Sequence, residues 1–141
     1  MSALVDTSIW SLALRRRTRQ ALTGPEQELV AVWATLLREN GAVIIGPIRQ
    51  EILSGVREAK QFRQLQLRLE AIPNTPIEDQ DYIQAALFYS RCRAKGVAGT
   101  AVDLLICAVA ARLALPVLTT DQDFVRYAKL LPIRLYPHPR R

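Results

Sequence analysis

The sequence has few of the residues that most often carry nucleophilic or zinc chemistry. Among 141 residues there are two cysteines and one histidine. Cys92 and Cys107 have no CxxC neighbour and no histidine nearby, so we expect reduced structural thiols, not a disulfide or a zinc site. His138 stands in a Pro-His-Pro stretch, and a Ser-His-Asp or Cys-His mechanism would depend on this one residue. Such a mechanism is therefore not expected.

Long apolar runs are also missing. No run reaches the ~18 residues that a membrane-spanning helix needs, and residues 1–6 have neither the basic region nor the apolar core of a signal peptide. We therefore expect a cytoplasmic protein. The hydrophobic content of 50% and the charged content of 23% are those of a globular chain. Its length fits one domain, spanning residues 1–141.

Positive charge is in excess. The chain has 19 lysines and arginines against 13 acidic residues, a formal net charge of +6. This balance suits a polyanionic partner such as nucleic acid, although on charge alone a solvated basic surface explains it equally well. Two basic clusters contribute: Arg15, Arg16, Arg17 and Arg19, and then Arg91, Arg93 and Lys95.

Short apolar runs alternate with helical stretches along the chain. Strands are expected at 4–5, 42–45, 117–119 and 133–136, with a short edge strand at 71–73. Helices are expected from about Ser8, from Thr23 to Asn40, after Pro47, and at 58–70, 78–95, 100–115 and 121–131.

In the helix expected at 78–95, the spacing predicts that Ile83, Ala86, Leu87 and either Tyr89 or Ser90 face the core. The β-α-β-α order with continuously apolar strands indicates a parallel sheet with helices on both faces. The sequence thus predicts the α/β class: a three-layer α/β/α sandwich with a mostly parallel sheet of four to five strands.

Acidic residues follow the strands of this expected sheet. Asp6 comes directly after the first strand, Asp121 follows the strand at 117–119, and Glu51 lies early in the helix after 42–45. In open parallel sheets, ligands bind outside the carboxyl ends of the strands, so topology places these three acids at one edge. Asp103 is a fourth unusual acid, because it lies inside a very apolar helix.

Two of these acids have simple structural explanations. Asp6 could cap the first helix, although Ser8 or Thr7 could do the same. Glu51 could be a solvated helix residue, although its spacing places it beside the apolar side of its helix.

The other acids have capping explanations too. Asp103 stands three residues after Thr100, as in a capping box, but its side chain is shorter than the usual Glu or Gln. Asp121 or Asp123 could cap the last helix; Asp121 is preferred as a ligand because it is nearer the strand, with Asp123 as a supporting acid or cap. Capping explains each acid separately but not their convergence. Clustered carboxylates repel one another, and Mg²⁺ or Mn²⁺ would offset that repulsion.

Four segments together resemble the PIN-domain nucleases. They are Asp6-Thr7-Ser8, Glu51 shortly after Gly46-Pro47, the stretch from Asp103 to Ala108, and Thr119-Thr120-Asp121-Gln122-Asp123-Phe124. The length of the chain and the near-absence of additions are similar to those of the VapC toxins of toxin–antitoxin pairs.

The resemblance implies a Mg²⁺- or Mn²⁺-dependent endoribonuclease that acts on RNA, an antitoxin partner that blocks the site, and commonly a homodimer. By motif match, Asp6, Glu51, Asp103 and Asp121 take the acidic catalytic positions. Metal ligands would be Asp6, Asp103 and Asp121, with Glu51 acting through water or as a base. Ser8 and Thr120 would be supporting hydroxyls, with Thr119 as an alternative.

Two other functions compete with this interpretation. One is a non-catalytic basic module that holds RNA or a protein partner, with the acids as helix caps. The other is phosphate transfer through an aspartate. It is disfavoured because Ser8 stands where an Asp-x-Asp motif would have its second acid, and because Leu4 and Val5, not acids, precede Asp6.

Overall fold

Three short parallel strands lie at the centre of the fold. The computed structural model describes residues 1–15 and 22–137. Strand β1 (Ala3–Val5) lies between β2 (Ala42–Val43) and β3 (Val117–Leu118), and both neighbours pair parallel with it. The helical elements, in chain order, are α1 Thr7–Trp10, the π-helical turn η1 Ser11–Arg15, α2 Gly24–Arg38, α3 Gly46–Ser54, α4 Ala59–Leu69, α5 Asp79–Ala94, α6 Ala101–Leu113 and α7 Asp123–Leu130.

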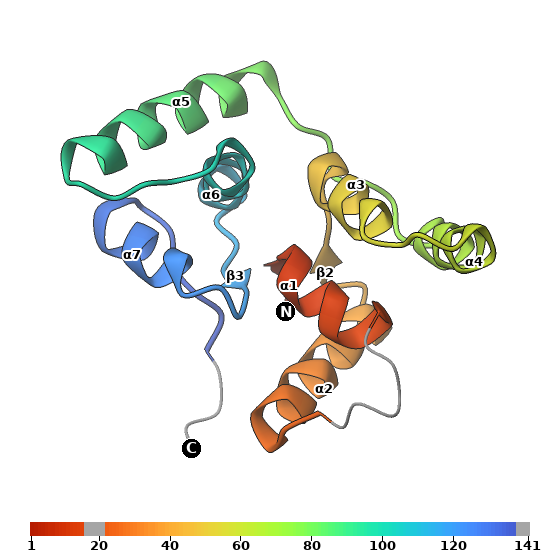
Figure 1. Cartoon of the computed structure of the whole chain (residues 1–141). Helices are drawn as coiled ribbons and strands as arrows, with labels where there is room; N and C mark the ends of the chain where they lie inside the picture. The colour runs from red at the N-terminus through yellow and green to blue at the C-terminus, as the bar shows by residue number, and fades with distance from the viewer. Residues whose placement is uncertain (16–21, 138–141) are drawn as a thin grey trace.

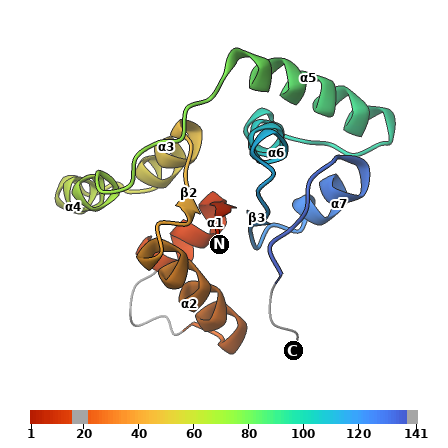
Figure 2. The same ribbon diagram turned by 180° about the vertical axis from the view of Figure 1, so that it is seen from behind.

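Helices flank the strands on both sides. Helices α5, α6 and α7 gather on the side of β3, α1 and α2 lie on the side of β2, and α4 lies at the outer end beside α3 (Figure 1 and Figure 2). All three residues of β1 are completely buried, and α6 is buried along 104–110. This explains why both segments are continuously apolar, and it confirms the α/β class.

The sheet is smaller than the predicted four to five strands. In the described part of the chain, the last expected strand is reduced to one isolated parallel bridge between Val117 and Leu135. The strand expected at 42–45 ends at Val43 because Ile45 already begins α3 as its N-cap residue. The carbonyl of Ile44 accepts from the backbone N–H of Thr75 at 2.8 Å, outside the sheet.

The edge strand predicted at 71–73 is wrong. This segment is a turn after α4, in which the Ile72 N–H donates to the Leu69 carbonyl at 3.0 Å. The guanidinium of Arg49, from α3, donates to the carbonyls of Leu69 and Ile72 and to the side chain of Asn74. Because a side chain satisfies these backbone acceptors, the segment does not need a neighbouring strand.

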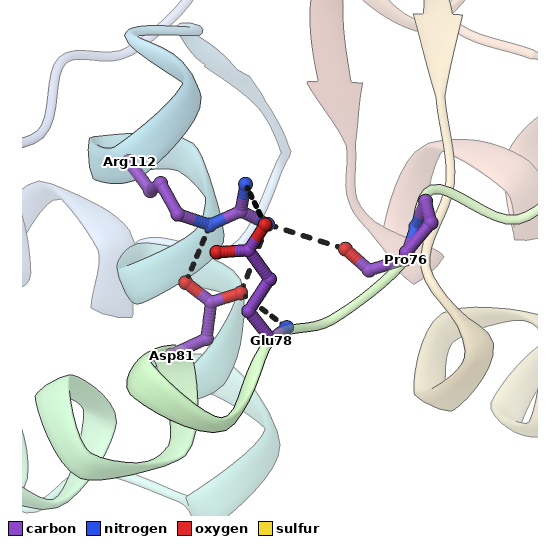
Figure 3. Close-up of polar contacts among 4 residues, drawn as sticks. All are labelled: Pro76, Glu78, Asp81 and Arg112. Carbon is purple, nitrogen blue, oxygen red and sulfur yellow. Dashed lines mark hydrogen bonds and ion pairs between the residues drawn. The ribbon is translucent and has the colours of Figure 1, made fainter.

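The predicted orientation of the helix at 78–95 is also wrong. Ile83 and Leu87 are 63% and 57% exposed, whereas α5 buries Asp81, Ala85, Phe88 and Cys92. An ion pair explains this rotation. Asp81 accepts from the Arg112 guanidinium of α6 at 2.8 and 2.9 Å, and Arg112 also contacts Glu78 and the Pro76 carbonyl (Figure 3). A buried charge needs a partner, so this ion pair favours the orientation in which Asp81 faces α6 together with the apolar Phe88 and Cys92.

Other expectations are confirmed or lie outside the described ranges. Cys92 and Cys107 are buried free thiols, and burial raises the pKa of Cys107 well above its ordinary value. Of the helices in the described ranges, none combines the length and the apolar character that crossing a bilayer would require. Arg16, Arg17 and Arg19 of the first basic cluster lie outside the described residues.

Candidate functional site

The ends of β1 and β3 bring together residues far apart in sequence. Asp6 follows β1 and Thr119 follows β3. The Asp6 N–H donates to the Leu118 carbonyl at 2.9 Å, which aligns the two strand ends. The Thr119 hydroxyl therefore reaches Asp6 and donates to its Oδ2 at 2.7 Å. Parallel pairing thus joins segments 113 residues apart at the predicted edge.

Asp6 does not cap its helix through its side chain. It occupies the N-cap position of α1 without a side-chain capping hydrogen bond, and it is only 6% exposed. The Ser8 hydroxyl donates to the same Oδ2 at 2.9 Å. Burial raises the pKa of Asp6, and the hydrogen bonds from Thr119 and Ser8 oppose that rise. The two hydroxyls therefore orient a buried carboxylate instead of leaving it to cap a helix.

The same two hydroxyls order the loop after β3. The Ser8 oxygen accepts from the Thr120 N–H at 3.0 Å, and the Thr119 oxygen accepts from the Asp121 N–H at 2.9 Å. Ser8 holds the position expected from the sequence. Thr119, the alternative to Thr120, is the threonine whose hydroxyl contacts the Asp6 carboxylate, and Thr120 contributes its backbone.

Three carboxylates converge next to this buried acid. Asp103, Asp121 and Asp123 each offer an oxygen, and these oxygens all lie within 4.8 Å of one another. Burial raises the pKa of Asp103, and the negative charges of Asp6 and Asp121 raise it further. Asp6 therefore belongs to the same electrostatic cluster, although among the described residues it is not in the set of converging oxygens. Carboxylate oxygens are ligands that suit Mg²⁺ or Mn²⁺.

The capping explanation fails for Asp103. The Thr100 hydroxyl accepts from the Asp103 N–H at 3.0 Å and so caps α6 by itself. The Asp103 carboxylate instead accepts from the Tyr127 hydroxyl at 2.8 Å. The hydroxyl of Tyr127 opposes the rise in the pKa of Asp103.

Capping explains part of the placement of Asp121 and Asp123. One oxygen of Asp121 accepts from the Asp123 N–H at 2.9 Å, at the start of α7. Asp123 forms an ion pair with Arg126, one turn later on α7. An oxygen of Asp123 also lies within the converging set.

Glu51 lies at the rim and not within the converging set. Its side chain is exposed and accepts from the Thr7 hydroxyl at 2.7 Å. With Thr7 and Val102 it lines a hollow of about 530 Å³. Thr7 follows Asp6 and Val102 precedes Asp103 in the sequence, but among the described residues none of the four aspartates lines this hollow.

Tyr127 is the residue that the sequence interpretation missed. It is completely buried, its ring lies edge-on to Phe124 at 5.1 Å between centroids, and its hydroxyl reaches Asp103. A buried tyrosine needs a partner for its hydroxyl. Its position four residues after Asp123, on the buried side of α7, was the available signal.

Comparisons with known proteins point to one family. The sequence model of a family described as the PIN domain matches residues 3–130. No curated protein matches the chain at a significant level.

Several solved structures share the fold. One is FitAcB from Neisseria gonorrhoeae, 23% identical, with a TM-score of 0.73 over 96% of this chain and 96% of that one. A second is VapBC2 from Rickettsia felis bound to a DNA fragment from their promoter, 14% identical, with a TM-score of 0.74 over 99% and 100% of the two chains. A third, FitAB bound to an IR36 DNA fragment, is 20% identical with a TM-score of 0.71 over 95% and 93%.

Proposed function

Because this chain belongs to the PIN-domain family, we propose that it is a metal-dependent endoribonuclease and the toxin of a type II toxin–antitoxin pair. Residues 1–141 would form a single domain of this kind. One observation carries the proposal: the oxygens of Asp103, Asp121 and Asp123 converge within 4.8 Å, beside a buried Asp6. Capping accounts for the contact between Asp121 and Asp123, but not for the approach of Asp103 from α6.

The residues present fit a divalent cation. Burial and mutual repulsion raise the pKa of Asp103, and burial raises that of Asp6, so an added positive charge would stabilise both ionised forms. We assign Asp6, Asp103 and Asp121 as ligands of Mg²⁺ or Mn²⁺, with Asp123 as a further oxygen donor. When bound, such a cation supplies Lewis acidity and a water nucleophile at neutral pH.

The surrounding side chains would position the acids for phosphodiester hydrolysis. Ser8 and Thr119 hold the Asp6 carboxylate, and Tyr127 holds that of Asp103. Glu51, held by Thr7 at the rim, would act through water or as the base. Arginine contacts to RNA phosphates, from the basic clusters of the sequence, would position the substrate without reading its sequence.

RNA cleavage by matched variants tests this proposal. Asp6→Asn and Asp103→Asn keep the size of the side chain, remove its charge and replace one acceptor oxygen with an NH₂ donor. They should lower Mg²⁺- or Mn²⁺-dependent cleavage by about 10²–10⁴-fold while the fold is retained. Glu70→Gln, which removes an exposed acid after α4, should cleave like the wild type. Full cleavage by either aspartate variant would refute the assignment.

The partners are part of the same proposal. The likeness to the VapBC2 and FitAB structures supports an antitoxin that binds this chain and blocks its site, and a homodimer is proposed as well. Co-purification with the product of a small adjacent gene, with loss of RNA cleavage in the complex, tests the antitoxin. Unchanged cleavage in a stable complex would contradict it.

A further inference from the structure

Two neighbouring residues of α7 donate to two different acids of the candidate site. Tyr127 donates to Asp103, and the guanidinium of Arg126 donates to Asp123 and forms an ion pair with it. Both acids belong to the converging set. Among the described residues, this is the one ion pair that joins an acid of that set to an arginine or lysine. Arg126 therefore brings a positive charge of the protein itself to the site.

The two donors differ in burial. Tyr127 is completely buried and its ring packs edge-on against Phe124, so its hydroxyl is held in place. The side chains of Arg126 and Asp123 are 56% and 41% exposed. Exposed ion pairs contribute little free energy, because water screens the charges and the long side chain loses freedom when it is held. Arg126 can therefore leave Asp123 for another anion at small cost.

We propose that Arg126 exchanges Asp123 for a phosphate of the RNA when a divalent cation is bound at the site. The inference rests on the proposed function, since it takes RNA as the substrate and the aspartates as cation ligands. An arginine has five N–H donors, and the bond to Asp123 uses one of them. A phosphate accepts two parallel hydrogen bonds from the same planar group, so it is a stronger partner than one carboxylate oxygen.

The charge of the site gives the reason for this exchange. The four aspartates carry four negative charges when all are ionised, and one divalent cation leaves two of these uncompensated. This remainder would repel an RNA phosphate, which is itself negative. The guanidinium of Arg126 halves the remainder and also supplies donors to the phosphate. Before the RNA binds, however, the cation and Arg126 compete for the same carboxylate, that of Asp123.

The alternative is an ion pair that only supports the first turn of α7. Asp123 and Arg126 are three residues apart, a spacing at which such pairs stabilise helices slightly. Removal of Arg126 would then lower the stability a little and leave the affinities for the cation and for RNA unchanged. The exchange predicts changes of opposite sign in these two affinities, so the two roles can be distinguished.

Cation binding without RNA is the first measurement. Arg126→Gln should lower the Kd for Mn²⁺ by about two- to fivefold, because Asp123 loses its competing partner. Titration calorimetry on the full-length protein measures this Kd, and circular dichroism checks that each variant is folded. Lys129→Gln is the matched control: it removes the same charge from an exposed residue one turn further along α7 and should leave the Kd unchanged. In an Asp123→Asn background, Arg126→Gln should no longer change the Kd.

RNA cleavage at saturating Mn²⁺ is the second measurement. Arg126→Gln should raise the KM for a single-stranded RNA by about tenfold or more, because a charged hydrogen-bonding partner of the phosphate is lost. The slope of log KM against log salt concentration should fall by about 0.7, the contribution of one phosphate contact on a single strand. A merely structural role would leave this slope unchanged, and Lys129→Gln should change neither quantity.

The two measurements separate this inference from the proposed function. Either an unchanged Kd for Mn²⁺ or an unchanged KM in Arg126→Gln would overturn the inference, while cleavage by the wild type would leave the proposed nuclease intact. Weaker binding of Mn²⁺ by Arg126→Gln would also overturn it. A wild type that binds Mn²⁺ without cleaving RNA would overturn the proposed nuclease, and a lower Kd in Arg126→Gln would then still support the competition for Asp123.

Discussion

The hydrogen bond from Tyr127 to Asp103 can be removed with little other change. Phenylalanine keeps the completely buried ring and its edge-on contact with Phe124. Burial and the neighbouring Asp103 raise the pKa of Tyr127, so its hydroxyl stays protonated and acts as the donor. Tyr127→Phe therefore deletes one bond of 2.8 Å to a half-buried carboxylate.

The size of the effect follows from the charge of the acceptor. Hydrogen bonds to charged groups contribute about 1.5–3 kcal/mol, and the partial exposure of Asp103 favours the lower end. A loss of about 1.5 kcal/mol lowers the melting temperature by about 5 °C for a chain of this length. Thermal unfolding at neutral pH, followed by circular dichroism without metal, measures this loss.

The same bond sets a pH dependence. Burial raises the pKa of Asp103, and the Tyr127 hydrogen bond opposes that rise. Without the bond the pKa rises further, so a smaller fraction of Asp103 is ionised at any given acidic pH. Because the ionised form would bind the cation, Tyr127→Phe should reduce RNA cleavage most at acidic pH, and the deficit should shrink as the pH rises.

A pH–rate profile of the wild type and of Tyr127→Phe checks this expectation. The acidic limb should move to higher pH in the variant. A deficit of equal size at every pH would show that Tyr127 matters only for the fold. An unchanged profile together with unchanged stability would refute the role of the hydrogen bond altogether.

Two further predictions concern metal binding and the α5–α6 ion pair. At a free Mn²⁺ concentration of about 100 times its Kd, the free energy of unfolding of the wild type should rise by about 2.7 kcal/mol and its melting temperature by about 9 °C. Asp103→Asn should lose most of this shift. No shift in the wild type would favour the non-catalytic module. Arg112→Met should lower the free energy of unfolding by about 3 kcal/mol at neutral pH, because it leaves the buried Asp81 carboxylate without its cation. Arg112 lowers the pKa of Asp81. The contribution of this ion pair to the free energy of unfolding is therefore complete above the ordinary pKa near 4, and it is lost as the pH falls through the lowered pKa. The gap between wild type and variant in urea unfolding should therefore close in acid, and a constant gap would contradict the assignment.

The helix ends and the starts of β1, β2 and β3 were predicted to within a residue or two, because local chemistry decides them. Thr23 accepts from the Glu26 N–H in a capping box at the start of α2, and the apolar runs form β1, β2 and β3. The strand predicted at 71–73 was wrong because the Ile72 carbonyl accepts from the side chain of Arg49, 23 residues away in the sequence. The predicted orientation of α5 was wrong because this helix has a second apolar spacing, through Phe88 and Cys92, which is buried together with the ion pair of Asp81.

The sequence by itself determined the α/β class and the acids that lie near one edge of the sheet, because the order of elements along the chain and the residue types can be read from it directly. The tertiary structure decided how those acids are held. The hydroxyls of Ser8 and Thr119 donate to Asp6, and that of Tyr127 donates to Asp103. Glu51 lies outside the converging set and accepts from the hydroxyl of Thr7. These contacts join segments more than twenty residues apart, apart from Ser8 to Asp6, and such pairs depend on packing that no local pattern encodes. Burial, and with it the raised pKa of Asp6 and Asp103, exists only once the core has formed.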